Sequence, residues 1–129
     1  MIRCIRLWND EGGASHVQRG RIGLGEAGES GGSLLSEGAS ARRISFEETP
    51  TGGALAWHTA PRRQFVVTLT GTLDFITRDG ERFTLDPATV LLAEDTVGTG
   101  HAWELLGDEP WRRVYVELDD EASVPFVAD

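Results

Sequence analysis

The chain has 129 residues, of which 40% are hydrophobic, so it is long and apolar enough for one domain with one core. Its formal net charge of −9 disfavours nucleic acid and anionic membrane surfaces as partners, because both attract basic surfaces. The single cysteine, Cys4, excludes an internal disulfide and a cysteine-based zinc site. No apolar run is long enough for a signal peptide or a membrane span, so we expect a cytoplasmic protein.

Short β-rich runs, separated by Gly, Pro, Asp and Asn, predict an all-β sandwich or barrel. No window shows the sustained periodicity of an amphipathic helix. The hairpin at residues 73–85 is the clearest, because Asp79-Gly80 readily forms a tight turn. We expect strands at residues 3–8, 20–24, 42–47, 54–59, 64–70, 73–78, 82–85, 89–93, 101–106 and 112–118.

Two segments lack this pattern. Residues 25–40 are rich in Gly and Ser, which predicts a flexible surface excursion rather than a domain boundary. Such an excursion could close over the mouth of a barrel. Residues 119–129 are acidic, and we expect this tail to be loosely docked.

The most informative motif lies within residues 52–71. His58 follows Gly52 by six residues, Gln64 follows His58 by six, and Gly71 follows Gln64 by seven. Side chains alternate between the faces of a strand, so His58 shares a face with small alanines that leave room around it. A second block, LLAEDTVGTGH, ends at His101.

The blocks LAWHTAPRRQFVVTLTG and LLAEDTVGTGHAW, with GGASHVQ near the N-terminus, resemble a subgroup of small bacterial and fungal single-domain cupins. The resemblance implies an all-β jelly roll, the cupin double-stranded β-helix. It implies a core barrel at about residues 42–118 within a single domain of residues 1–129. Cupins of this size are commonly homodimers, and strand 3–8 could pair across the interface. The subgroup has no settled activity, so the resemblance implies a fold and not a substrate.

The resemblance also implies a metal site, because many cupins hold a metal through three His and one Glu. Here Ala60 stands where the second His is usual, and Gln64 stands where the Glu is usual. His58 and His101 are placed inside the barrel, facing each other. We therefore expect a divalent ion (Zn, Fe, Ni or Mn) held by His58, Gln64 and His101, or else no cofactor.

Other polar residues could join this site. Glu94 and Asp95 precede His101 and could supply a carboxylate from the rim, although Asp95 could equally cap the loop. His16 could contribute if the N-terminal strand crosses the mouth. Arg62 and Arg63 could clamp an acidic substrate, because a guanidinium fork suits a carboxylate, or could be paired rim charges.

Two hypotheses remain open. In the first, a small, acidic molecule binds in the barrel beside a metal on His58 and His101, with Arg62, Arg63, Gln64 and Trp103 contacting it and His58, His101 or Glu94 as catalytic candidates. In the second, the barrel is metal-free. It then binds or senses a ligand, or works as an isomerase or epimerase in which one His is the acid–base group.

Overall fold

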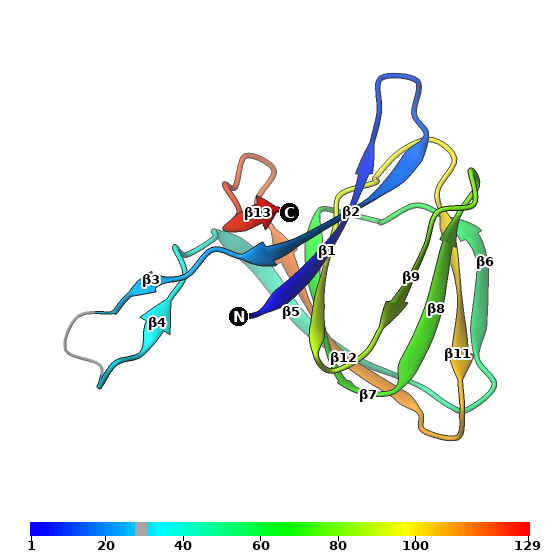
Figure 1. Cartoon of the computed structure of the whole chain (residues 1–129). Coiled ribbons are helices and arrows are strands. Elements are labelled where there is room, and N and C mark those ends of the chain that lie inside the picture. The colour runs from blue at the N-terminus through cyan, green and yellow to red at the C-terminus, as the bar shows by residue number, and fades with distance from the viewer. Residues whose placement is uncertain (28–30) are drawn as a thin grey trace.

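The computed structural model describes residues 1–27 and 31–129, and every regular element in these ranges is a β-strand (Figure 1). The expectation of an all-β chain is confirmed. In chain order the strands are β1 (Arg3–Asn9), β2 (Ser15–Ile22), β3 (Gly25–Glu26), β4 (Leu34–Leu35), β5 (Ala41–Thr49), β6 (Ala54–His58), β7 (Gln64–Thr70), β8 (Thr72–Thr77), β9 (Arg82–Leu85), β10 (Thr89–Ala93), β11 (His101–Leu106), β12 (Trp111–Leu118) and β13 (Phe126–Ala128). These ranges contain no helix that could cross a membrane.

The strands form two main sheets that enclose the core, and a short hairpin that extends away from them (Figure 1). The larger sheet has the order β13-β2-β1-β10-β7-β12-β5, and the smaller sheet has the order β6-β11-β8-β9. Strand β1 pairs with β10 in parallel, whereas the other strand pairs among the described residues are antiparallel. Both sheets are open at their ends, so hydrogen bonds do not close the strands into the barrel expected from the sequence.

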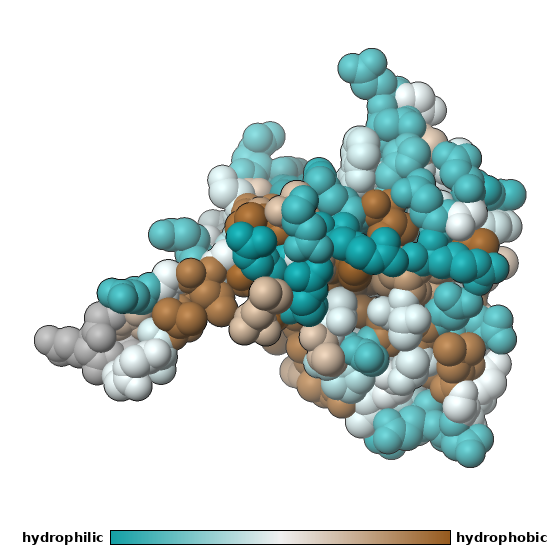
Figure 2. All heavy atoms as spheres, viewed as in Figure 1, coloured by the Kyte–Doolittle hydropathy of each residue, from teal (hydrophilic) through white to brown (hydrophobic). Residues whose placement is uncertain are grey.

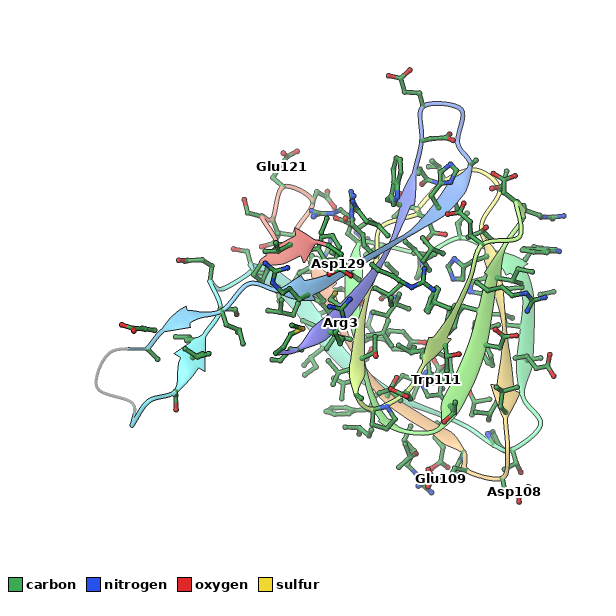
Figure 3. The ribbon with its side chains drawn as sticks, in the orientation of Figure 1. Arg3, Asp108, Glu109, Trp111, Glu121 and Asp129 are labelled. Carbon is green, nitrogen blue, oxygen red and sulfur yellow. The ribbon has the colours of Figure 1, made fainter. Side chains whose placement is uncertain are left out.

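The main core lies between the two sheets, and alternation along the strands explains it. In β8, Leu73, Phe75 and Thr77 are buried while their neighbours are more exposed, as expected for a strand with one face on a core. Trp111 also points into this space, where its ring meets those of Phe75 and Trp103 edge-on (Figure 3). These packed rings give the sandwich an aromatic centre.

A second cluster lies on the outer face of the larger sheet. Its buried members are Cys4, Leu92 and Leu118, and apolar residues from the C-terminal tail pack against them. Burial raises the pKa of the Cys4 thiol to about 12, so this cysteine is an inert core residue.

The prediction of a loosely docked tail is therefore wrong. Strand β13 pairs with β2, and Arg3 forms an ion pair of 2.7 Å with Asp129 (Figure 3). The acidic composition of the tail concealed Phe126, which packs on the second cluster.

The segment at residues 25–40 contains the two-stranded hairpin of β3 and β4. Residues 28–30, which belong to the segment expected to be flexible, lie outside the described residues. Leu34 and Leu35 are largely exposed, and apolar spheres accordingly lie over this hairpin in Figure 2. The hairpin extends away from the sandwich and does not cover the cavity between the sheets (Figure 1).

Candidate functional site

A cavity of about 530 Å³ lies between the two sheets. Apolar side chains from both sheets form much of its wall, and a few polar groups converge on it, as is usual for small-molecule sites. The polar and charged residues that line it are Arg43, Ser45, Glu47, His58, Gln64, His101, Arg113, Tyr115 and Glu117.

His58 and His101 meet at one end of this cavity. His58 is the last residue of β6 and His101 is the first residue of β11, and the two are paired across these neighbouring strands. Their ring centroids lie 4.4 Å apart in an edge-to-face arrangement. The structure thus brings together the two histidines that the sequence motifs singled out.

Gly100 permits this approach. It has a φ of 74°, and a Cβ at this position would lie 2.3 Å from the carbonyl oxygen of His58. Only glycine adopts this backbone conformation without cost and leaves that space empty. The glycine before His101 is therefore a condition for bringing the two imidazoles together.

His101 is held from behind by Asp95. Nδ1 of His101 lies 2.6 Å from Oδ2 of Asp95, and the hydroxyl of Ser15 donates to the same oxygen at 2.8 Å. Asp95 is 0% exposed, and its Oδ1 has no hydrogen-bond partner among the described residues. The backbone oxygen of Asp95 also accepts from the N–H of Ala60, so this residue ties the loop before His101 to the first motif.

His58 is oriented by the backbone. Its Nδ1 lies 2.8 Å from the carbonyl oxygen of Ala56, which can only accept, so Nδ1 carries the proton. Partial burial lowers the pKa of His58, and the nearby imidazole of His101 acts in the same direction. His58 is therefore neutral at neutral pH.

Both rings consequently present Nε2 as the uncommitted nitrogen. Within residues 1–27 and 31–129, Nε2 of His58 and of His101 makes no hydrogen bond, while each Nδ1 has an acceptor. Histidines that bind metals usually donate their other N–H to a carboxylate or a backbone carbonyl in this way. The same arrangement suits a neutral imidazole that removes a proton from a ligand.

Gln64 and Ala60 also line the cavity. Gln64 is the first residue of β7, is 7% exposed and lines the cavity, so its amide is available to a ligand or an ion there. Ala60 also lines the cavity and is buried, and its side chain is a single methyl group. The available donor set is therefore two imidazoles and one amide.

Glu94 and Arg63 lie elsewhere. Glu94 forms ion pairs with Arg6 at 2.5 Å and with Arg63 at 2.7 Å, and neither Glu94 nor Arg63 lines the cavity. Alternation explains both positions, because Arg63 precedes the inward Gln64 and Glu94 precedes the inward Asp95. The structure thus does not bring these two predicted site residues to the histidines.

Arg62 lies at the edge of the cavity. Its Nε is 3.4 Å from Glu117, which lines the cavity, and Nε of Arg43 is 3.6 Å from the same carboxylate. Two guanidinium groups therefore share one carboxylate, which leaves excess positive charge at this edge. Arg43 is the residue here that the sequence analysis did not single out.

The far wall holds a buried arginine that sequence reasoning also missed. Arg113 is 2% exposed, its guanidinium lies 3.7 Å from the ring centroid of Trp111, and it forms an ion pair with Glu47. It also donates to the hydroxyl of Tyr115, a residue whose pKa is raised by burial. Trp103, predicted to contact substrate, lines the same cavity.

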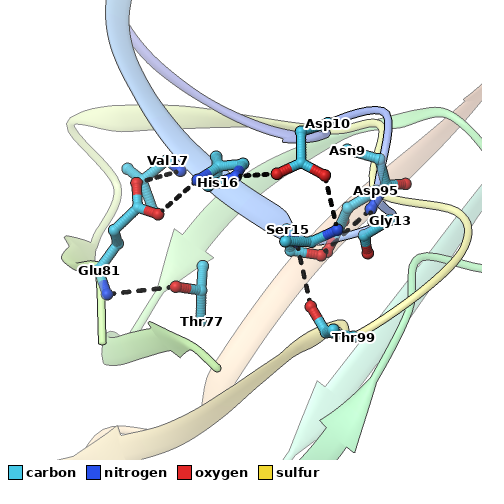
Figure 4. A network of polar contacts seen from close by, with 11 residues as sticks. Asn9, Asp10, Gly13, Ser15, His16, Val17, Thr77, Glu81, Asp95 and Thr99 are labelled. Carbon is cyan, nitrogen blue, oxygen red and sulfur yellow. Dashed lines mark hydrogen bonds and ion pairs between the residues drawn. The ribbon is translucent and has the colours of Figure 1, made fainter. Parts of the chain in front are cut away.

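His16 lies in a polar network at the end of the sandwich, which also contains Ser15 and Asp95 (Figure 4). Its Nε2 lies 2.7 Å from Asp10 and its Nδ1 lies 2.7 Å from Glu81. These bonds, the one to Asp10 above all, raise the pKa of His16, and the bond to His16 lowers the pKa of Asp10. His16 therefore joins the β1–β2 loop to the β8–β9 hairpin and does not line the cavity.

The same region contains a group that could hold a metal ion. One ligand atom from each of His16, Asp79 and Glu81 lies within 4.8 Å of the others. Of these three, the sequence indicated only His16 as a possible site residue. Asp79 and Glu81 lie far from His16 along the chain, so no motif spacing connects them to it. Both nitrogens of His16 already face carboxylates, so a proton competes with any metal for this position.

Comparison with known proteins adds no further assignment. No protein-family model matches the chain, and no curated protein matches it.

Proposed function

We propose that the chain is a small cupin whose cavity binds a small acidic molecule beside a divalent metal held by His58 and His101. The observation that carries this proposal is the orientation of the two imidazoles, each with Nδ1 bonded to an acceptor and Nε2 uncommitted beside the cavity. Gln64 is the third donor. The motif spacing supports the cupin assignment, and the two facing sheets are compatible with it.

The donor set fits a transition metal. Neutral imidazoles suit Zn, Fe and Ni, and an amide oxygen is a harder ligand that these ions and Mn also accept. A metal bound there would polarise an oxygen of the ligand. The protein itself would orient the metal ligands. Asp95 fixes the ring of His101, the carbonyl of Ala56 fixes the ring of His58, and the aromatic wall excludes water.

The acidic character of the ligand rests on the cavity edge. Arg43 and Arg62 share only Glu117, so a carboxylate that enters there meets excess positive charge. Both arginine side chains are substantially exposed and can turn toward a ligand. Arg63 has no such role in this proposal, because Glu94 holds it at 2.7 Å.

One observation favours a second candidate function. The buried Asp95–His101 pair is a suitable acid–base group without any metal, since the carboxylate stabilises an imidazolium that forms during proton transfer. In this alternative the cavity binds a ligand without metal, and the protein either senses the ligand or isomerises it, with His101 moving the proton.

A titration of the metal-free protein with Zn²⁺, followed by the imidazole NMR signals, tests the proposal. We expect the signals of His58 and His101 to change together up to one equivalent, in the wild type and equally in His16→Gln. If the wild type shows changes at His16 alone, the metal belongs to the network at the end of the sandwich. If no imidazole responds, the metal proposal fails and the metal-free alternative stands.

A matched pair of variants tests the ligand. Small carboxylates should bind the zinc-loaded wild type more tightly than Arg62→Gln, while Arg63→Gln should bind them as the wild type does. Equal binding by all three proteins would contradict the role of the cavity edge.

A further inference from the structure

Strand β5 is an open edge of the larger sheet. It is nine residues long, stands last in the strand order, and pairs only with β12 among the described residues. Most of its residues are exposed on both faces. An edge of this length presents a row of unpaired backbone groups that can accept another strand.

The outer face beside this edge is apolar. Phe46 of β5, Val114 of β12 and Val67 of β7 form one row across the sheet. Ile44 is 61% exposed, Phe46 72%, Val67 37% and Leu69 53%. The C-terminal tail covers the other half of the same face, so this half is the part left open. Contiguous apolar surface of this kind indicates an interaction site.

The sequence of β5 indicates what covers it. Residues 42–48 read Arg-Arg-Ile-Ser-Phe-Glu-Glu, with two cations on one side of Ser45 and two anions on the other. In an antiparallel pair of two such strands centred on Ser45, each cation lies opposite an anion. Arg42 faces the partner's Glu48 and Arg43 faces the partner's Glu47. Ile44 meets the partner's Phe46, so the apolar rows also join.

We propose that the chain forms a two-fold dimer by antiparallel pairing of β5 with β5 of a second copy, with Ser45 opposite the partner's Ser45. The two seven-stranded sheets then continue into each other, and the open apolar halves of their outer faces adjoin. A two-fold axis requires such a self-complementary surface, because each contact occurs twice. This proposal goes beyond the cavity chemistry and does not depend on a metal.

The pairing also borders the cavity. Arg43, Ser45 and Glu47 line it from β5, so the partner's β5 extends this wall. Within the chain, Arg43 already pairs with Glu117 and Glu47 with Arg113. The outer residues Arg42 and Glu48 do not line the cavity, so substituting them leaves the lining residues intact. Glu48 pairs with Arg112 of the same chain at 2.6 Å on the exposed surface, so Glu48→Arg also breaks this pair, and Arg42→Glu is the cleaner of the two substitutions.

The test is a charge exchange across the interface, measured by sedimentation equilibrium. Arg42→Glu places Glu opposite the partner's Glu48, and Glu48→Arg places Arg opposite the partner's Arg42. Each variant alone should dimerise at least tenfold more weakly than the wild type, because like charges oppose twice in the dimer. An equimolar mixture should regain dimers, since every opposed pair is then complementary.

Two control variants with the same change in net charge show whether weaker dimerisation depends on the position of the charge or on net charge alone. Arg19→Glu on β2 and Glu104→Arg on β11 are exposed strand positions away from β5, and both should dimerise as the wild type does. A wild type that stays monomeric up to ~1 mM, the weak limit of specific association, would overturn the proposal. If the equimolar mixture of the two charge variants does not regain dimers, the proposed pairing of Ser45 with the partner's Ser45 is wrong.

A crosslink tests the register directly. Residues directly opposite in an antiparallel pair have Cβ atoms about 4.5–5.5 Å apart, close to the spacing a disulfide needs. Ser45→Cys should therefore form an intermolecular disulfide under mild oxidation, whereas Glu48→Cys, which faces the partner's Arg42, should not. Equal crosslinking of both variants, or of neither, would contradict this pairing. The native Cys4 is fully buried and does not compete.

Discussion

His101 and Asp95 are joined by a hydrogen bond of 2.6 Å between two buried side chains, Nδ1 of the imidazole and Oδ2 of the carboxylate. This bond keeps the proton of His101 on Nδ1 and leaves Nε2 beside the cavity. The hydroxyl of Ser15 holds the same oxygen at 2.8 Å. Metal binding by His101 would therefore depend on a carboxylate that does not itself bind the metal.

Replacing Asp95 should weaken metal binding without removing a ligand. Asp95→Asn keeps the shape but loses the charge that favours the proton on Nδ1 of His101. Metal affinity should fall about 10–100-fold, as is usual when such a partner is lost. Competition with a chromophoric chelator measures this, with Asp74→Asn, which changes an exposed pair, as control. Unchanged affinity in Asp95→Asn would contradict the role of this bond.

Two substitutions of Gln64 should change metal affinity in opposite directions. Gln64→Glu adds a carboxylate of equal size at the position where the cupin motif has one, and its charge offsets that of the ion. We expect at least tenfold tighter binding, about 1.4 kcal/mol. Gln64→Leu removes the donor and should bind more weakly than the wild type. Calorimetric titration with Zn²⁺ measures both, and identical affinities in all three proteins would exclude Gln64 as a ligand.

The network around His16 should stabilise the fold only within a window of pH. The raised pKa of His16 means that its contribution is complete below its ordinary value of 6.5 and is lost as pH rises through the folded-state value. The lowered pKa of Asp10 means that its contribution is present above 3.8 and is lost as pH falls. The difference in melting temperature between wild type and His16→Gln should therefore be largest between pH 3.8 and 6.5.

The docking of β13 leaves no room for a side chain at Gly20. A Cβ there would lie 2.3 Å from the carbonyl oxygen of Val127 and 2.6 Å from the ring of Phe126. Gly20→Ala should destabilise the protein by about 1–3 kcal/mol, the usual cost of overpacking. Chemical denaturation measures this. The same substitution in Phe126→Ala should cost less, because one of the two contacts is gone, and an equal cost would mean that the ring does not cause the effect.

Much of the strand pattern was predictable from the sequence. Alternation and turn residues gave β7, β9, β10 and β11 with the bounds that the structure has. Strand β2 begins at Ser15, earlier than expected, because its first half pairs with β1 although its composition is polar. Strand β13 was missed because pairing with a distant strand leaves no mark in a short acidic tail.

The candidate site was predictable only in part. The cupin resemblance implied that His58, Gln64 and His101 face the interior, and all three line the cavity, the two histidines from the smaller sheet and Gln64 from the larger. Arg113 and Arg43 come from strands remote in sequence, so no motif connected them to the histidines. The sequence did not decide whether Asp95 caps the loop or supplies a carboxylate to the site. Its role depends on the buried partners Ser15 and His101, which only the tertiary structure brings together.

The metal content of untagged protein, measured by mass spectrometry for the wild type, His58→Ala and His101→Ala, tests the metal site at the two histidines. We expect near-stoichiometric divalent metal in the wild type and its loss in both variants, with His16→Ala retaining it. A wild type that stays metal-free after reconstitution, or metal that persists in both His58→Ala and His101→Ala, would contradict this metal site.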